Sequence, residues 1–278
     1  MFLRNKLLIL WSTTQSNQKI MKISLIGSGN VATHLSIALM QAKHKIIDVY
    51  SRTLASAQEL ATRCDACATN RLEDVSRHSD IYIISVKDDA IADIVRNLCP
   101  ERKHAIFVHT AGSVDISVFE GKAQHYGVLY PMQTFSKSRA VDLKSIPCYI
   151  EASDETTLQF LSDFAHTIFG NVRTLSSADR RYLHLSAVFA CNFVNYCYDI
   201  AGSLVQRCGI PFTDLLPLID ETAAKVHQLS PHKAQTGPAV RFDENVIKHQ
   251  LELLASNVDE AKVYKILTQG IHKTHVNE

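Results

Sequence analysis

Residues 22–32 read KISLIGSGNVA, a short apolar run followed by two closely spaced glycines. The apolar part predicts a buried strand, and the amphipathic stretch after it, Val31–Ala42, predicts a helix. Gly27, Gly29 and Ala32 fit the fingerprint of a dinucleotide-binding turn. The first glycine permits the tight turn, the second lets a pyrophosphate approach the backbone, and the alanine keeps the helix close to the sheet. We therefore expect a pyrophosphate to bind at this turn.

The residues of the turn are the expected contacts of the phosphates. Amide groups at a helix N-terminus have no partner within the helix and bind anions. The expected contacts are Gly27, Ser28, Gly29, Asn30 and Val31.

Strand-like and helix-like stretches alternate from Met21 to Leu175. Strands are expected at Ile46–Tyr50, Ile81–Val86, Ala105–His109, Val128–Tyr130, Cys148–Glu151 and Val172–Leu175. Helices are expected between them, at Ala55–Arg63, Ala90–Leu98 and Glu155–Phe169. Strands this apolar are buried on both faces, which indicates a parallel sheet covered by helices. The pattern predicts an α/β fold with a doubly wound Rossmann sheet.

After Ser176 the strand pattern does not return. Asp179–Cys208 lacks proline and contains a single glycine, and helical stretches follow at Phe212–Gln228, Glu244–Ala255 and Val258–His272. We expect an N-terminal extension over residues 1–20, a Rossmann domain over 21–176 and an all-helical domain over 177–278. The helical domain is expected to close the active site and to form a homodimer. Its apolar series is Leu183, Val188, Phe189, Phe193 and Tyr196.

The first twenty residues imitate a secretory signal only superficially. Arg4 and Lys6 precede the apolar run Leu7–Trp11, which is shorter than the roughly seven residues that such a signal requires. We interpret the segment as an extension, or as the result of translation that starts at Met21. Nowhere does the chain approach the roughly 18 consecutive apolar residues of a membrane span.

The composition narrows the choice of partners and compartment. With 29 Lys and Arg against 28 Asp and Glu, the net charge is +1, so no basic excess attracts nucleic acid or an acidic membrane surface. The seven cysteines, an odd number in a long chain, indicate reduced thiols in the cytoplasm. The thirteen histidines lack the spacing of metal sites, and we expect no metal.

Cys64 and Cys67 have the spacing of zinc and redox sites. A zinc site needs a second pair at matching spacing, and none follows. A redox pair would open a helix after a strand, whereas this pair follows the helical stretch Ala55–Arg63. We keep a thiol redox function at this pair as a third hypothesis, beside the two functions stated at the end of this section.

The end of the second strand indicates which dinucleotide binds. An NAD enzyme carries an acidic residue there for the ribose hydroxyl, whereas this chain has Ser51, Arg52 and Thr53. A guanidinium between two hydroxyls suits a 2′-phosphate. Asp48 lies inside the strand and is not the expected ribose ligand. We predict NADP(H) as the cofactor, with Arg52 as a solvated loop residue as the alternative.

Two later loops are expected to complete the cofactor site. Ligands of such sheets lie at the carboxyl ends of the strands. Val86 and Lys87 follow one strand, and His109 and Thr110 begin the polar loop 109–113 after the next, where we expect the nicotinamide. The alternative for the second loop is a plain polar turn.

Five motifs give the chain a family resemblance. They are GSGNVA at the fingerprint, HTAGS at 109–113, YPMQTF at 130–135, HLSAVFACNF at 184–193 and TGPAVRFD at 236–243. From Met21 to His272 the chain resembles a two-domain family of uncharacterised NADP oxidoreductases. These proteins join a Rossmann domain, like that of deazaflavin-dependent NADP oxidoreductases, to a C-terminal helical domain of unknown function. More distantly it is similar to pyrroline-5-carboxylate reductase and the β-hydroxyacid dehydrogenases, which implies reduction of C=N or C=O groups and dimerisation through the helical domain.

The chain departs from these relatives at two positions. The hydroxyacid dehydrogenases carry a catalytic lysine four residues before an asparagine, but Val188 stands where that lysine would precede Asn192. Tyr130 stands where many members of the closer family have histidine before the proline.

His184, Asn192 and Arg241 are the candidate catalytic residues. At about 100° per residue, the eight steps from His184 to Asn192 return to within about 80° of the start, so both could face one cleft. His184 can donate a proton near neutral pH, and Asn192 can orient a polar atom; the alternative is a packed pair on a helix face. Arg241 could hold a substrate carboxylate or brace its loop through Asp243 or Glu244.

These features favour an NADPH-dependent reductase of a small carbonyl or imine compound. A non-catalytic NADP(H)-binding sensor is the alternative, since the lysine of the hydroxyacid dehydrogenases is missing at Val188.

Overall fold

The computed structural model describes residues 19–276, which form two compact units that divide between Cys191 and Asn192. The predicted extension over residues 1–20 therefore lies outside the described residues, apart from its last two. The strands are β1 (Lys22–Ile26), β2 (Lys45–Tyr50), β3 (Cys67–Thr69), β4 (Ile81–Ile84), β5 (Ile106–His109), β6 (His125–Pro131), β7 (Pro147–Ala152) and β8 (Asn171–Thr174).

The helices surround this sheet in the first unit and make up the second. In the first unit they are α2 (Asn30–Gln41), α3 (Leu54–Cys64), α4 (Asp88–Leu98), α5 (Glu155–Ile168), α6 (Ser177–Ala187) and the short η1 (Leu72–Asp74), η2 (Ile116–Phe119) and η3 (Leu143–Ser145). The π-helical segment η4 (Val188–Phe193) follows. The second unit contains α7 (Val194–Arg207), η5 (Phe212–Leu215), α8 (Leu216–Lys225), α9 (Pro231–Ala234), α10 (Pro238–Arg241), α11 (Glu244–Leu253) and α12 (Val258–His275).

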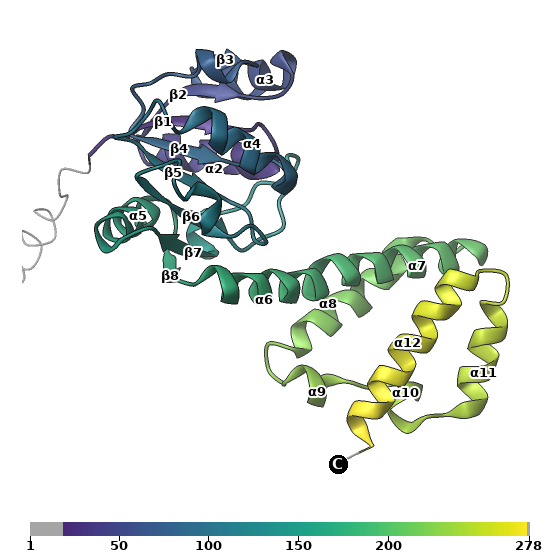
Figure 1. Cartoon of the computed structure of the whole chain (residues 1–278). Helices are drawn as coiled ribbons and strands as arrows, with labels where there is room; N and C mark the ends of the chain where they lie inside the picture. The colour runs from purple at the N-terminus through teal and green to yellow at the C-terminus, as the bar shows by residue number, and fades with distance from the viewer. Residues whose placement is uncertain (1–18, 277–278) are drawn as a thin grey trace, which may run out of the picture. The chain divides into compact units, whose positions relative to one another are not determined.

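The sheet has the strand order β3-β2-β1-β4-β5-β6-β7-β8 (Figure 1). The pairs from β3 to β6 are parallel, and this part has the order of a doubly wound dinucleotide-binding sheet. The predicted Rossmann fold is confirmed. The expectation of parallel pairing fails only between β6 and β7, which are antiparallel. The connection 132–146 contains just the short η3, whereas parallel neighbours usually need a helical crossover.

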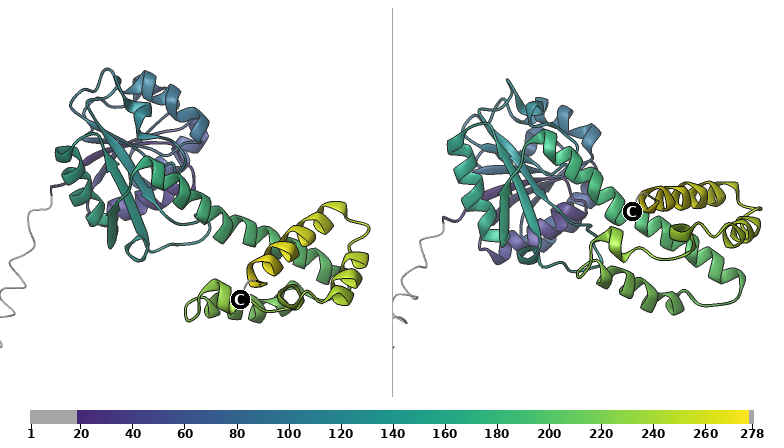
Figure 2. Two further views of the ribbon diagram at one scale, coloured as in Figure 1. Left: turned by 60° about the horizontal axis from the view of Figure 1, so that its bottom comes forward. Right: turned by 90° about the horizontal axis from the view of Figure 1, so that it is seen from below.

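Strand residues alternate between two apolar layers on opposite faces of the sheet. On β1, Ile23 and Leu25 join the layer with α2, α3 and α5, while Ile26 joins the layer with α4. On β4, Ile83 and Ile84 divide between the layers in the same way. Figure 2 shows the helices on both sides of the twisted sheet. This double coverage explains why the strands are apolar throughout.

The turn after β1 can be built only with glycine at position 27. Gly27 has φ +118°, and a Cβ atom there would lie 2.2 Å from the carbonyl oxygen of Ser85. The Gly27 amide donates to the carbonyl of Tyr50 at 2.8 Å, which ties the turn to the end of β2. The first glycine of the fingerprint therefore allows the carboxyl ends of β1, β2 and β4 to lie side by side.

A buried polar cluster lies between β1 and β2. The carboxylate of Asp48 accepts hydrogen bonds from the hydroxyl of Ser24 at 2.9 Å and from the amide of Ser76 at 3.0 Å. Asp48 is 5% exposed. Since its carboxylate is engaged inside the fold, it is not positioned to hold a ribose.

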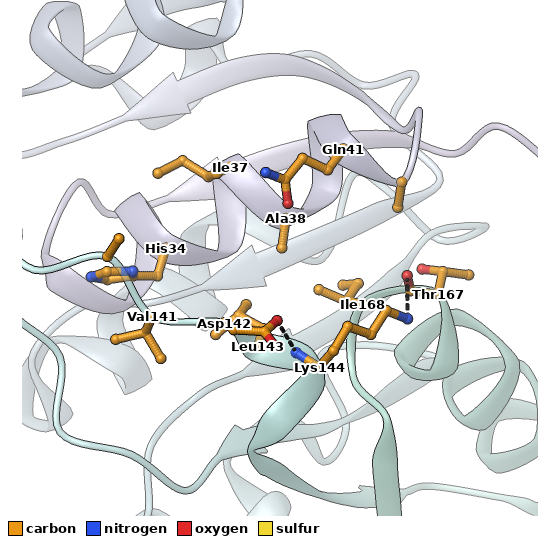
Figure 3. A pocket seen from close by; sticks show the side chains of 12 residues that line it. His34, Ile37, Ala38, Gln41, Val141, Asp142, Leu143, Lys144, Thr167 and Ile168 are labelled. Atoms are coloured by element: carbon orange, nitrogen blue, oxygen red, sulfur yellow. Dashed lines mark hydrogen bonds between the residues drawn. The ribbon is translucent and has the colours of Figure 1, made fainter.

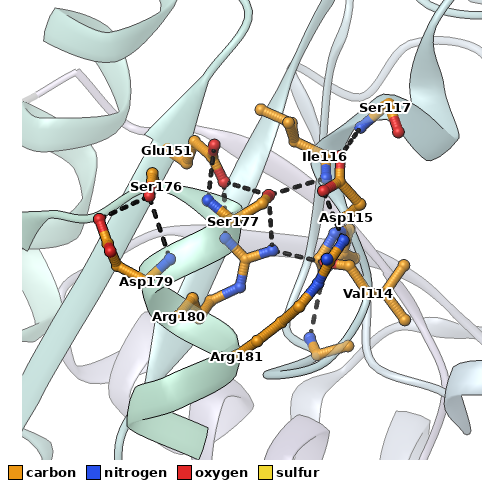
Figure 4. Close-up of polar contacts among 12 residues, drawn as sticks. Val114, Asp115, Ile116, Ser117, Glu151, Ser176, Ser177, Asp179, Arg180 and Arg181 are labelled. Carbon is orange, nitrogen blue, oxygen red and sulfur yellow. Dashed lines mark hydrogen bonds and ion pairs between the residues drawn. The ribbon is translucent and has the colours of Figure 1, made fainter.

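A buried ion pair fastens α6 to the sheet (Figure 4). Arg180 is 1% exposed, and its Nη1 lies 2.6 Å from Oε2 of Glu151 on β7. The hydroxyl of Ser177 donates to the same carboxylate at 2.6 Å and accepts from Arg180 Nη2 at 3.0 Å. Nη2 also donates to the carbonyl of Val114, beyond the end of β5. This network, the Arg180 brace, fixes the start of α6 against β7 and the loop after β5.

The second unit is helical, as predicted, but has almost no core of its own. Of residues 192–276, only Ala239, Leu254 and Thr268 are buried. Its first helix continues the expected stretch Asp179–Cys208, which η4 interrupts with a wider π-helical turn. The assumption of 100° per residue between His184 and Asn192 therefore does not hold.

The described residues contain neither a membrane-spanning helix nor a cluster of metal ligands. None of the helices within 19–276 combines the length and the apolar character needed to cross a bilayer. Over the same range, no three His, Cys, Asp or Glu side chains gather as a possible metal site.

Replacing Arg180 with methionine should cost about 3–5 kcal/mol of unfolding free energy, because the Glu151 carboxylate is left without its partner. Urea unfolding followed by circular dichroism measures this loss. The matched control is Arg181→Met, which removes the exposed ion pair between Arg181 and Asp115 and should cost no more than about 1 kcal/mol. Equal losses in both variants would contradict the assigned role of the brace.

Candidate active site

A cavity of about 850 Å³ opens at the carboxyl edge of the sheet. Its walls come from the turn after β1, the loops after β2, β4, β5 and β6, the helix α4 and one side chain of α6. Ligands of doubly wound sheets bind at this edge, and the volume suits a large organic cofactor. The cavity is therefore the candidate site.

The start of α2 is open to an anion. Its N-cap is Gly29, no described side chain caps it, and its first turn carries no acidic residue. A Cβ atom at Gly29 would have no neighbour within 4 Å, so a ligand can reach the backbone here. Gly27, Ser28, Gly29, Asn30 and Val31 all line the cavity, as expected from the sequence. The uncapped amides fit a pyrophosphate.

The loop after β2 places Ser51 and Arg52 in the same cavity. The Ser28 hydroxyl donates to the Ser51 hydroxyl at 2.9 Å, which joins this loop to the fingerprint turn. Arg52 is exposed, so its guanidinium is accessible to a phosphate. Thr53 lies at the N-cap of α3, where its hydroxyl donates to Ser56 at 2.8 Å, and it is not among the lining residues.

The loop after β6 supplies two lining residues, Phe135 and Lys137, that the sequence did not indicate. The side-chain Nδ2 of Asn30 donates to the carbonyl of Phe135 at 2.8 Å, which holds this loop over the start of α2. Lys137 lines the cavity, and its Nζ lies 3.2 Å from a carboxylate oxygen of Glu59 on α3. The loop has no helix or strand periodicity in its sequence. Its path, and therefore these contacts, could not be predicted from the sequence.

The loops after β4 and β5 contribute as expected, with one exception. Val86, Lys87 and Thr110 line the cavity. His109 is fully buried instead, and its ring stacks on Phe119 at 5.7 Å between centroids. Burial lowers the pKa of His109 to about 3, so its ring stays neutral. His109 does not line the cavity, so its side chain is not placed to contact the cofactor as predicted.

Tyr130 and His184 meet in the part of the cavity formed by β6 and α6. The Tyr130 hydroxyl lies 3.1 Å from Nδ1 of His184, and the two rings meet edge to face. A Cβ atom at Gly112 would lie 2.5 Å from the same nitrogen, so only glycine leaves room for this imidazole. The sequence indicated His184 as a proton donor and missed Tyr130 as its partner.

Asn192 and Arg241, the other two predicted catalytic residues, belong to the second unit. Asn192 lies in η4, and Arg241 is the last residue of α10. Both are exposed within that unit. Asp243 caps α11 by accepting from the amide of Val246 at 3.3 Å. The roles of Asn192 and Arg241 in catalysis stay predictions.

A second cavity, of about 460 Å³, lies between α2, η3 and the end of α5 (Figure 3). Its cation, Lys144, donates to the carbonyls of His166 and Thr167, both at 3.0 Å, and so caps α5. None of the fingerprint residues lines this cavity. We assign no cofactor contact to it.

The Cys64–Cys67 pair is poorly arranged for redox chemistry. Cys64 is buried as the last residue of α3, and Cys67 is exposed at the start of β3. Burial raises the pKa of the Cys64 thiol, which disfavours the reactive thiolate. The geometry weighs against the thiol redox hypothesis.

Two family models match the chain. Residues 12–130 match the Rossmann-like domain, and residues 146–271 match a domain of unknown function, DUF2520. No curated protein gives a significant match.

Solved structures match nearly the whole chain. A structure described as a putative NADP oxidoreductase, BF3122 from Bacteroides fragilis, is 47% identical with a TM-score of 0.88, over 91% of this chain and 98% of that one. An imine reductase from Myxococcus stipitatus in complex with NADP⁺ is 14% identical with a TM-score of 0.61, over 91% and 92%. A 1-pyrroline-5-carboxylate reductase from Streptococcus pyogenes is 14% identical with a TM-score of 0.59, over 91% and 99%. The last two share the fold.

The resemblance stated from the sequence motifs is thereby confirmed. This chain belongs to the two-domain family of BF3122, in which a Rossmann-like domain precedes a DUF2520 domain.

Proposed function

We propose that this protein is an NADP(H)-dependent oxidoreductase that reduces a small carbonyl or imine compound by hydride transfer. The observation that carries the proposal is a single cavity that joins an uncapped helix N-terminus to a paired phenol and imidazole. The name of the relative BF3122 supports the class of reaction and the cofactor. The imine and pyrroline-carboxylate reductases share the fold and support the choice of substrate.

Each part of the cavity has a distinct task in this proposal. The amides at the start of α2 hold the pyrophosphate, and Ser51 and Arg52 hold the 2′-phosphate. The cofactor supplies the hydride when it is bound. The side chains at the far end of the cavity hold the substrate and supply a proton as charge develops on its oxygen or nitrogen. The proposal gives proton donation to His184. Asn192 and Arg241, which belong to the second unit and are not among the lining residues of this cavity, are proposed to orient the substrate and to contact its carboxylate.

A homodimer is part of the proposal. A unit of this size needs a buried core, and residues 192–276 bury only three side chains in the single chain. Its exposed apolar side chains include Tyr196, Leu218, Leu253 and Ile266. A second copy that covers this surface would remove it from water. The seven cysteines, all free, suit the reducing cytoplasm, where we place the protein.

Purified protein should oxidise NADPH in the presence of at least one compound from a panel of oxoacids, aldehydes and cyclic imines. Loss of absorbance at the nicotinamide band measures the reaction, and a sample without the compound is the control. Tight NADPH binding with no oxidation by any of these compounds would instead support the non-catalytic sensor.

Arg52→Ala should weaken NADPH binding about 10- to 100-fold, because hydrogen bonds to charged groups contribute about 1.5–3 kcal/mol. Binding of NADH, which lacks the 2′-phosphate, should be unchanged. Calorimetry measures both affinities. The matched control is Arg77→Ala, since Arg77 is similarly exposed, pairs with Glu101 and lies outside the lining of the cavity. An equal loss for both dinucleotides would refute the assignment of Arg52.

The dimer should appear in light scattering as a particle of twice the 31.0 kDa of one chain. The reason is the apolar surface of residues 192–276, which one chain leaves in water. A particle with the mass of one chain, measured at micromolar protein concentration, would contradict the dimer. The hydride-transfer proposal would be unaffected.

A further inference from the structure

We propose that Tyr130 is the catalytic residue that gives its hydroxyl proton to the substrate, and that His184 restores that proton from Nδ1. This inference rests on the proposed function, and it adds a residue that the sequence did not indicate. It also changes the role of His184 from direct donor to the group behind the donor.

The contact between the two side chains is the first support. The Tyr130 oxygen lies 3.1 Å from His184 Nδ1, within hydrogen-bond distance. Both residues line the cavity that also holds the fingerprint turn. Such a pair in a closed core would be a packing contact, but this pair faces the space in which the cofactor and substrate are proposed to lie.

The position of Tyr130 in the sheet is the second support. β6 is parallel to β5, so Tyr130, next to its last residue, lies at the same carboxyl edge as the fingerprint turn. The polar loop after β5 reaches the same part of the cavity through Thr110 and Gly112. Ligands of this fold bind along that edge. A proton donor on β6 therefore needs no movement of the sheet to reach a bound substrate.

The surroundings of Tyr130 keep its phenol in the donor form. Tyr130 is 8% exposed, and burial raises the pKa of its hydroxyl. Arg180 on α6 acts in the opposite direction, while Asp88 on α4 and Tyr149 on β7 also raise the pKa. At neutral pH the phenol is thus protonated, as a general acid must be.

Two structural devices hold His184 beside this phenol. Gly112 leaves the space, since a Cβ atom there would lie 2.5 Å from Nδ1 and 2.6 Å from Cγ of the imidazole. The Arg180 brace fixes the helix one turn earlier, because Arg180 and His184 are four residues apart on α6. His184 is therefore held by the backbone of one loop and by a buried ion pair on its own helix.

The proposed step balances in protons and electrons. The hydride and its electron pair pass from NADPH to the carbonyl or imine carbon, and the π electrons of the C=O or C=N bond move to the oxygen or nitrogen. That atom takes the proton of the Tyr130 hydroxyl. The Tyr130 phenolate then takes the Nδ1 proton of His184, and solvent returns a proton to the imidazole. The net change is reduction of the substrate by NADPH and one proton from water.

Tyr130→Phe tests the donor. Its kcat should fall about 10²- to 10⁴-fold, the usual contribution of a positioned general acid. The affinity for NADPH, measured by fluorescence titration, should be unchanged. The control is Tyr126→Phe, which removes the hydroxyl of another tyrosine of β6 that lies outside the cavity lining. A substrate that the wild type reduces, turned over equally fast by Tyr130→Phe, would overturn the proposal.

His184→Gln and Gly112→Ala test the role of the imidazole. The pH profile of kcat should differ between the wild type and His184→Gln, and His184→Gln should also lose most of its rate, because the group that returns the proton to Tyr130 is gone. Gly112→Ala should lower kcat by displacing the imidazole while Tyr130 is untouched. An unchanged pH profile in His184→Gln would overturn the proposed return of the proton.

A spectroscopic measurement separates this inference from the proposed function. With NADP⁺ bound, the ¹⁵N NMR signal of His184 Nδ1 should shift between wild type and Tyr130→Phe, and Tyr126→Phe should leave it in place. Identical signals in all three would overturn the pairing. If instead the wild type oxidises no NADPH with any compound, the proposed function fails and this inference fails with it.

Discussion

The main constraint on this structure is the turn at Gly27, where a side chain has no room. A Cβ atom at that position would lie 2.2 Å from the carbonyl oxygen of Ser85, so β1, β2 and β4 could not end beside one another. Because they do, α2 starts at their common edge with its amides uncapped. The same backbone conformation that closes the sheet therefore leaves the amides free for the anion that we propose to bind there.

A second constraint links the sheet to the chemistry. The Arg180 brace joins α6 to Glu151 of β7 and to the carbonyl of Val114. With that end of α6 fixed, His184 meets Tyr130 in the cavity. Arg180 and Glu151 neutralise each other, so α6 is held in place without an unpaired ion in the interior. The proposed cofactor-binding residues and the proposed proton donor thus belong to one frame, although they lie at different strands.

The sequence indicated most of the fold, because its signals are local. Apolar runs and the fingerprint at Gly27 gave the strands of the Rossmann sheet and its phosphate turn. The short β3 and the reversal at β7 were missed, because three residues carry no period and the direction of a strand depends on its connection. Tyr130 was noted only as a departure from the family. Its pairing with His184 arises from contacts between residues 54 apart, and no spacing rule reports such a contact.

The central claim is that backbone amides at the turn after β1 hold the pyrophosphate of the cofactor. Hydrogen exchange of those amides tests it most directly. Saturating NADPH, with binding verified by calorimetry, should slow the exchange of the amides of residues 28–32. The amides of the second cavity, at residues 140–144, should exchange as before. Bound NADPH that leaves exchange at residues 28–32 unchanged, or a folded protein that gives no binding heat with either nicotinamide dinucleotide, would contradict the account.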